Sequence, residues 1–189
     1  MGMIDTSEFR KGLKLEIEGE PFVIVDFQHV KPGKGSAFVR TRIKSLTSGN
    51  VLDKTFKSGD RFSSPDLEEK TMQYLYHEGN QYLFMDQSTY EQTSIDGEHL
   101  GEAKQYLKDE LVVRVLFHNG VTIGVELPTF VEMKVVEAKP SVRGDTATGG
   151  TKQAVMESGV TVQVPLFVEE GEIIKVDTRD GSYVERVSK

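Results

Sequence analysis

Apolar and polar residues alternate with a period of two through most of this chain. The pattern is clearest in LKLEIE (13–18), FVIVDF (22–27), AFVRTRIK (37–44), FVEMKVVEA (130–138) and EIIKVDT (172–178). Successive side chains of a β-strand point to opposite faces, so the alternation predicts strands that bury one face. The dipeptide Asn119-Gly120 between two such runs is a strong hairpin signal. One short helix is expected at about 102–107, and the rest predicts an all-β fold.

Breaks in the pattern divide the strands into three blocks of similar length. The first break is Ser63-Ser64-Pro65, after which the composition turns acidic, and the second is Leu127-Pro128. Each block holds about five short strands, which is typical of a small barrel. We therefore expect three small β-barrels in series, with domains at 1–64, 65–127 and 128–189. No convincing sequence repeat relates the blocks.

The bulk composition narrows the class of protein. The 189 residues include no cysteine, which excludes disulfides, thiol nucleophiles and cysteine-based zinc sites. There is no apolar run of membrane-spanning length and no apolar signal segment near the start, so we expect a cytoplasmic protein without membrane contact. The net charge of −7 by itself argues against binding to nucleic acid.

That average hides a polarised distribution of charge. Residues 1–64 carry 11 lysines and arginines against 8 acidic residues, 65–127 carry 4 against 12, and 128–189 carry 8 against 10. Between Phe27 and Leu52 five basic residues occur with no acidic one, namely Lys31, Lys34, Arg40, Arg42 and Lys44. On a strand Arg40, Arg42 and Lys44 share one face, which forms a basic stripe. Such a stripe either protects a solvated strand edge or meets an anionic partner, for which RNA is the obvious candidate.

The stripe leads to a glycine-flanked lysine in the segment HVKPGKGSAF (29–38). Pro32 presets a turn, and Gly33 and Gly35 can adopt positive φ, so a sharp hairpin tip is expected. A turn does not need Lys34, and the neighbouring glycines offer nothing to pack its stem against. The lysine must point outward, either as an ordinary solvated residue or as a functional group.

Signals for enzymatic chemistry are weak. The loop GDTATGGT (144–151) superficially resembles a phosphate-binding loop, but Gly150 stands where the phosphate-binding lysine belongs and a strand pattern follows. The loop is either a surface loop or a segment whose amides, hydroxyls and Arg143 meet a ribose-phosphate chain. The four histidines have no metal-ligand spacing and are expected at the surface or at strand ends, and no carboxylate pair stands out. We expect no catalytic residues, no metal and no cofactor.

Aromatic residues gather in the middle block at Tyr74, Tyr76, Tyr82, Phe84 and Tyr90. They could form a platform on which bases stack. However, Tyr74 and Tyr76 are expected on one face with Met72, and Tyr82 on one face with Phe84, so core packing is the better interpretation.

Several long motifs resemble one known family. They are VKPGKG with FVRTRIKSLTSGNVLDKTFKSGD, then QYLYHEGNQYLFMDQSTYEQ, LPTFVEMKVVEAKPSVRGDTATGGTKQAV and VPLFVEEGEIIKVDTRDGSYVERV. In this order they resemble bacterial translation elongation factor P, whose eukaryotic and archaeal relative is the hypusine-containing initiation factor. The resemblance implies a KOW/SH3-like barrel followed by two barrels of the oligonucleotide-binding (OB) type, together shaped like a tRNA.

The same resemblance implies a function and its partners. A member of this family would bind the ribosome, both rRNA and ribosomal proteins, between the peptidyl (P) and exit (E) sites. It would lie beside a P-site peptidyl-tRNA stalled at consecutive prolines and promote peptide-bond formation as a monomer, without being an enzyme. Proline restricts its own backbone, so a factor that orients the tRNA lowers the barrier through positioning.

Individual residues take roles by position in the matching motifs. Lys34 would be the tip residue that reaches the acceptor end, and a lysine-modifying enzyme would extend it in many members. Lys31, Pro32, Gly33 and Gly35 would shape the tip. Gly144, Asp145 and Thr146 would lie near the E-site codon of the mRNA, and Tyr183 and Arg186 would contact the tRNA backbone. The alternative from composition alone is a generic single-stranded RNA-binding protein or chaperone, in which Lys34 is one charge among five.

Overall fold

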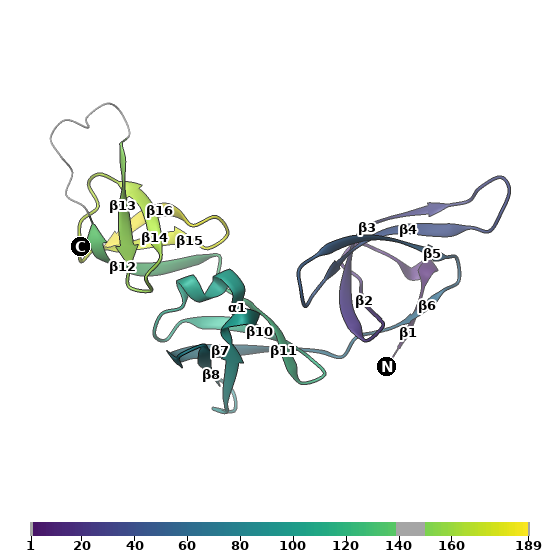
Figure 1. Ribbon diagram of the computed structural model, residues 1–189, viewed down its shortest axis with the longest axis horizontal. Coiled ribbons are helices and arrows are strands. Elements are labelled where there is room, and N and C mark those ends of the chain that lie inside the picture. Colours follow the sequence, from purple (N-terminus) through teal and green to yellow (C-terminus); the bar gives the residue numbers. More distant parts are fainter. Residues whose placement is uncertain (1, 139–149, 189) are drawn as a thin grey trace. The chain divides into compact units, whose positions relative to one another are not determined.

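The computed structural model describes residues 2–138 and 150–188 (Figure 1). Strands make up most of the described chain, so the all-β prediction is confirmed. They form one sheet of six strands and two sheets of five. The chain divides into two compact units, of which the first holds Met1–Glu69 with Leu116–Gly124 and the second holds Lys70–Val115 with Val125–Lys189.

The first sheet has the strand order β1-β6-β2-β3-β4-β5. A single-turn 3-10 segment, η1, follows its first strand and begins with a reciprocal cap between Asp5 and Glu8. One cluster of buried side chains, with Leu15, Val39 and Ile43 fully buried, fills the curved sheet. Its elements are β1 (Met3–Asp5), η1 (Thr6–Glu8), β2 (Lys14–Ile17), β3 (Glu20–Val30), β4 (Phe38–Ser45), β5 (Val51–Lys57) and β6 (Arg61–Ser63).

The second sheet has the order β11-β10-β7-β8-β9. Asn119 and Gly120 both have positive φ, so the predicted hairpin turn is confirmed. The expected helix is instead a short α-helix, α1, followed by a 3-10 segment, η2. The elements are β7 (Leu67–Glu78), β8 (Gln81–Asp86), β9 (Gln92–Asp96), α1 (Gly97–Leu100), η2 (Gly101–Tyr106), β10 (Val112–His118) and β11 (Val121–Glu126).

A bulge in β7 changes how the aromatic residues of this sheet are placed. Tyr74 lies opposite Phe84 but Tyr76 lies opposite Leu83, so the register shifts between the two tyrosines. Tyr74 and Phe84 are therefore core residues, as predicted, whereas Tyr76 is 56% exposed. The expectation that Tyr74 and Tyr76 share one face is wrong, because strict alternation ends at the extra residue.

The third sheet has the order β14-β13-β12-β15-β16. Strand β12 alternates between buried and exposed residues over most of its length, and Met133 and Val135 are completely buried. Its elements are β12 (Phe130–Ala138), β13 (Thr151–Met156), β14 (Thr161–Pro165), β15 (Ile173–Asp177) and β16 (Ser182–Ser188). Among the described residues no helix is long and apolar enough to cross a membrane.

Candidate functional site

The candidate site is the end of the β3–β4 hairpin, which extends beyond the rest of its sheet (Figure 1). The two strands pair from Phe22 opposite Ser45 to Val30 opposite Phe38, with one bulge beside Ile24. Residues 31–37 make the connection, so the predicted hairpin tip is confirmed. Gly35 has φ +107°, which a residue with a side chain rarely adopts, whereas Gly33 has no positive φ. The turn thus requires only the second glycine.

Lys34 lies at the end of this tip, between two glycines that have no side chain to pack against its stem. Lys31, Gly33, Lys34 and Gly35 are all exposed, and Pro32 is half-buried. In the described part of the chain Lys34 has no ion-pair partner. The base of the tip is fixed, since the Ser58 amide donates to the Ala37 carbonyl at 3.0 Å. The ammonium group is therefore carried on an anchored hairpin and remains available to a partner.

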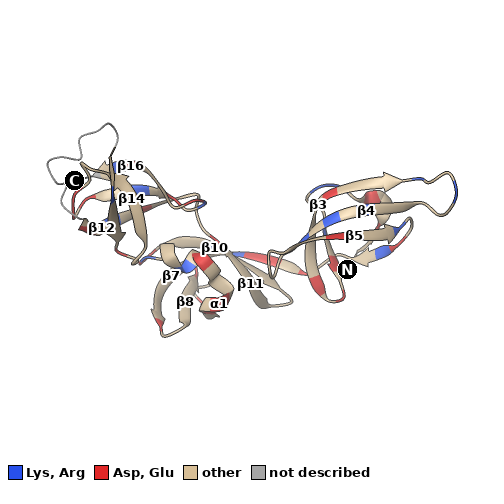
Figure 2. Ribbon diagram, turned by 45° about the horizontal axis from the view of Figure 1, so that its top comes forward, with Lys and Arg blue, Asp and Glu red and all other residues tan. Residues whose placement is uncertain are grey.

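The basic stripe follows strand β4 toward this tip. Arg40, Arg42 and Lys44 are exposed and alternate with buried Val39, Thr41 and Ile43, so the three cations share the outer face as predicted. In Figure 2 the ribbon is blue, the colour of lysine and arginine, at positions along β4 and at the tip of the hairpin. The stripe and Lys34 thus lie on one continuous element.

Two acidic residues just outside the basic segment alter the charge of the stripe. Arg42 donates through Nε and Nη2 to the two carboxylate oxygens of Asp53, at 2.9 and 3.3 Å. This pairing lowers the pKa of Asp53 and raises the pKa of Arg42. Asp26, also near Arg42, pairs with Lys11 at 3.0 Å, and its pKa is lowered. The middle of the stripe is therefore partly neutralised by internal pairing.

The outer members of the stripe are less engaged. The Arg40 guanidinium lies 5.7 Å from the centre of the Phe38 ring, a geometry that leaves its hydrogen-bond donors exposed. Lys44 has no ion pair within the described residues. Among the described residues Lys31, Lys34, Arg40 and Lys44 are thus cations of the hairpin that remain able to neutralise phosphates.

The second predicted group, Tyr183 and Arg186, lies on strand β16. A register shift places Tyr183 opposite Val176 and Arg186 opposite Ile174. Because Val176 and Ile174 both point into the core, the two candidate residues share that face although they are three positions apart. Only the bulge, which the sequence did not reveal, makes this arrangement possible.

Arg186 is engaged inside the protein. Its Nη1 donates to Glu172 Oε1 at 3.2 Å, and its guanidinium lies 5.4 Å from the centre of the Phe167 ring. The Glu172 carboxylate is buried and also accepts the Glu169 amide at 3.0 Å. Arg186 is therefore held by contacts within the protein.

Three family models match successive parts of the chain. They are the elongation factor P KOW-like domain at residues 5–62, the elongation factor P OB domain at 67–125 and the elongation factor P C-terminal domain at 131–186. The elongation factor P of Moorella thermoacetica is 52% identical over 184 residues, which cover 97% of this chain and 100% of that protein. The elongation factor P of Campylobacter jejuni (strain 81-176) is 52% identical over 189 residues, covering both chains completely.

The chain belongs to the elongation factor P family. It is accordingly a translation elongation factor, and the predicted KOW-like and OB-type folds are confirmed. Among solved structures, translation initiation factor 5A from Methanococcus jannaschii matches with a TM-score of 0.54 at 22% identity, over 64% of this chain and 90% of that chain. This similarity bears on the fold alone.

The loop candidates Arg143, Gly144, Asp145 and Thr146 lie outside the described residues. Among the described residues there is no cluster of three or more histidine, cysteine or acidic side chains able to hold a metal ion.

The contact between His118 and Glu16 was not predicted from the sequence. His118 ends strand β10, as its place before the turn suggested, but it is only 8% exposed. Its Nε2 lies 3.0 Å from Oε2 of Glu16, within the first compact unit. The two residues are 102 positions apart, so no local pattern could have indicated the contact.

Proposed function

We propose that this elongation factor binds the ribosome between the P and E sites and stimulates peptide-bond formation at consecutive prolines. In this proposal the β3–β4 hairpin reaches the acceptor end of the P-site peptidyl-tRNA, and Lys34 holds that end in a productive position. The factor is not an enzyme, because the bond is made by the ribosome and the gain comes from orientation. Membership of the elongation factor P family supports the general role.

The observation that carries the proposal is the isolation of Lys34. Its charge stands at the end of an anchored hairpin, between exposed glycines and without an internal partner. A bare tip of this kind can enter a narrow RNA channel, and Arg40 and Lys44 behind it can neutralise phosphates along the way. Exposure also makes the lysine accessible to a modifying enzyme, which would lengthen its reach.

The remaining contacts that we propose are inferred from the positions of residues in the family motifs. Gly144, Asp145 and Thr146 would lie near the E-site codon, and Arg143 beside them would meet the RNA backbone. Tyr183 would contact the tRNA backbone. For Arg186 the proposal requires that the guanidinium contact tRNA while it keeps its pairing with Glu172, or exchanges that pairing for a phosphate.

The test is the synthesis of a protein that contains three consecutive prolines in a purified bacterial translation system. The reactions contain no factor, wild type, Lys34→Ala, or Lys57→Ala as a control for charge elsewhere on the same sheet. We expect wild type and Lys57→Ala to relieve the stall and Lys34→Ala to fail, while synthesis from a message without prolines is equal in all four. Intact mass of protein from its native host shows whether Lys34 is modified.

A generic RNA-binding role gives a different result. The unpaired Arg40 and Lys44 would support it, since both can bind phosphates of any strand. If the stall is relieved equally by wild type and Lys34→Ala, the positioning role of Lys34 is wrong. If neither unmodified nor native-host wild type relieves the stall, the generic role becomes the better account.

A further inference from the structure

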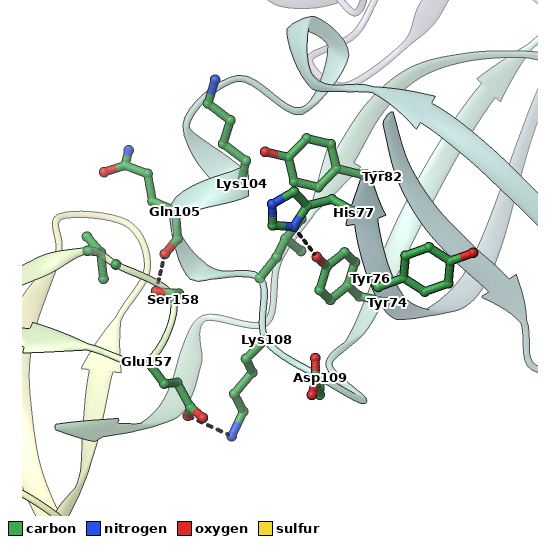
Figure 3. A pocket seen from close by; sticks show the side chains of 13 residues that line it. Tyr74, Tyr76, His77, Tyr82, Lys104, Gln105, Lys108, Asp109, Glu157 and Ser158 are labelled. Atoms are coloured by element: carbon green, nitrogen blue, oxygen red, sulfur yellow. Dashed lines mark hydrogen bonds and ion pairs between the residues drawn. The ribbon is translucent and has the colours of Figure 1, made fainter. Parts of the chain in front are cut away.

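A cavity of about 640 Å³ lies in the second compact unit, far along the chain from the hairpin (Figure 3). Strands β7 and β8 form one wall, η2 and the residues after it form another, and the turn between β13 and β14 closes a third side. Its size is within the range of small-molecule sites. Its lining includes Tyr74, His77, Tyr82, Lys104 and Gln105.

The wall from β7 and β8 is aromatic. His77 and Tyr82 lie opposite each other across the two strands, and their rings stack with centroids 5.0 Å apart and an interplanar angle of 21°. The bulge between Tyr74 and Tyr76 sets this pairing, because it shifts the register of the residues that follow. The stacked pair presents the outer face of a ring, and a planar ligand can extend the stack there.

Tyr74 holds the histidine of this wall in place. Its hydroxyl lies 2.9 Å from Nδ1 of His77, and burial raises the pKa of the Tyr74 phenol, so the group stays protonated and able to donate. The Nε2 atom of His77 has no hydrogen-bond partner in the described chain. The ring is therefore fixed through one nitrogen and can bind a ligand through the other.

The charged side chains around the cavity differ in whether they are paired and in the side of the cavity on which they lie. Lys108 lies 3.9 Å from Glu157, and the same Glu157 oxygen accepts the Lys134 amide at 2.9 Å, so this carboxylate is already paired. Lys104, on η2, is exposed and has no ion pair among the described residues. In Figure 3 Lys104 extends from one side of the cavity and Asp109 lies on another. An anion is thus favoured on the Lys104 side and disfavoured beside Asp109.

A hydrogen bond across the cavity holds its rim together. The Ser158 hydroxyl donates to the backbone carbonyl of Gln105 at 2.5 Å and so joins the β13–β14 turn to η2. The side-chain amide of Gln105 points away from this bond (Figure 3) and remains free to donate or accept. A preformed rim reduces the entropy lost when a ligand is ordered there.

We propose that this cavity binds a nucleoside monophosphate unit, with the base stacked on the His77–Tyr82 pair and the phosphate at Lys104. The exposed ring face suits a base, the unpaired ammonium suits a phosphate, and Gln105 and Nε2 of His77 supply polar contacts between them. The unit is supplied either by a free nucleotide or by a single-stranded RNA. The proposal is independent of Lys34 and of the ribosomal function.

The first test compares four probes by NMR titration of the amides of the full chain. AMP carries both the base and the phosphate, adenosine lacks the phosphate, and ribose 5-phosphate lacks the base. Hexaadenylate presents the same nucleoside monophosphate unit within RNA. We expect AMP to shift the amides of His77, Tyr82, Lys104 and Gln105, and to bind more tightly than adenosine or ribose 5-phosphate. Hexaadenylate that shifts the same amides at lower concentration identifies RNA as the source, whereas weaker binding than AMP identifies the free nucleotide.

Two variants, each with a matched control, test separately whether Lys104 binds the phosphate and whether Tyr82 binds the base. Lys104→Gln should weaken AMP roughly tenfold, the scale of one hydrogen bond to a charged group, and leave adenosine unchanged, while Lys134→Gln should change neither. Tyr82→Leu should weaken both AMP and adenosine, and Tyr90→Leu, at a 72% exposed tyrosine in the connection between β8 and β9, should weaken neither. Because Tyr82→Leu can disturb packing, its amide spectrum is first compared with that of wild type.

The proposal is overturned by any of three results. The first is no amide shift with AMP at millimolar concentration. The second is a set of shifts confined to other parts of the chain, such as residues 31–37. The third is AMP binding that Lys104→Gln leaves unchanged. None of these results bears on whether Lys34 relieves the stall at prolines, so the two proposals can fail separately.

Discussion

The β3–β4 and β15–β16 hairpins both carry exposed cations but use them differently. On the first, Lys34 and Lys44 have no ion pair in the described chain, and Arg40 lies over an aromatic ring. On the second, the cations are paired internally, as Lys175 with Glu185, Arg179 with Asp177 and Arg186 with Glu172. Net charge therefore does not locate a binding surface. A cation that the fold has already paired with a carboxylate is less available to an anionic partner than an unpaired one.

The difference follows from where acidic residues occur in each sequence. The 26 residues from Phe27 to Leu52 contain no acidic residue, so only the flanking Asp26 and Asp53 can reach the stripe. The C-terminal segment instead alternates glutamate and aspartate with its basic residues. Strand pairing then brings opposite charges together, as it does for Lys175 and Glu185. The first hairpin therefore leaves most of its cations unpaired in the described chain, whereas the second pairs its cations within the protein.

The largest expected effect comes from removing a paired cation. Arg186→Ala leaves the buried carboxylate of Glu172 without its cation and exposes one face of Phe167. Breaking a fully buried pair costs about 3–5 kcal/mol, and Arg186 is partly exposed, so the free energy of unfolding should fall by about 2–3 kcal/mol. Urea denaturation followed by circular dichroism measures this change.

The control is the double variant with Glu172→Gln. Replacing the carboxylate removes the uncompensated charge, so the double variant should be more stable than Arg186→Ala alone. If Arg186→Ala is as stable as wild type, the pair is not structural, and the contrast between the two hairpins fails.

A smaller effect is expected at the turn of the first hairpin. Gly35 has φ +107° and Gly33 has no positive φ, so alanine is strained at position 35 and tolerated at position 33. Gly35→Ala should lower the free energy of unfolding by about 1–2 kcal/mol, whereas Gly33→Ala should leave it within about 0.5 kcal/mol or raise it slightly. Thermal unfolding of the two variants beside wild type distinguishes them. Equal destabilisation would contradict the assignment of the turn to Gly35.

The pairing in the C-terminal hairpin also has a pH signature. The side chain and amide of Arg179 lower the pKa of Asp177 from 3.8 to about 2. A carboxyl whose pKa is depressed by folding stabilises the protein above its unfolded value, and this contribution is lost as the pH falls from about 4 toward 2. Carbon NMR of the carboxyl groups should place the Asp177 midpoint near 2. In Arg179→Gln the midpoint should rise toward 3.8, and an unchanged midpoint would show that the guanidinium is not its cause.

Much of the fold was predictable because its signals are local. The period of two, the Asn119-Gly120 turn and the Pro-Gly tip each depend on neighbouring residues, and the structure confirms the strands and turns they predict. The same local logic placed Arg40, Arg42 and Lys44 on one face. Lys34 could be singled out because a lysine between two glycines has no structural reason to be there.

The parts that were missed depend on register or on distant partners. One extra residue in β7 separates Tyr74 from Tyr76, and one in β16 brings Tyr183 and Arg186 to the same face. A bulge leaves no clear mark in an alternating sequence, because it is fixed by the partner strand. The pairing of Arg42 with Asp53 joins neighbouring strands, and that of Arg186 with Glu172 spans 14 positions. Such pairs become visible only when the strand register is known.

The smallest expected effect concerns Lys44, the unpaired cation at the far end of the stripe. Lys44→Ala removes an exposed side chain without an internal partner in the described chain, so the free energy of unfolding should stay within about 0.5 kcal/mol of wild type. If the stripe binds RNA, the plot of log affinity against log salt should become shallower by up to about one unit. Filter binding to a ribosome or a tRNA at several salt concentrations measures this slope. The matched variant is Arg179→Gln, whose cation is already paired with Asp177, and its slope should equal that of wild type. Equal slopes for wild type and Lys44→Ala would mean that an unpaired cation on this hairpin is no more available to RNA than a paired one, which would contradict the comparison itself.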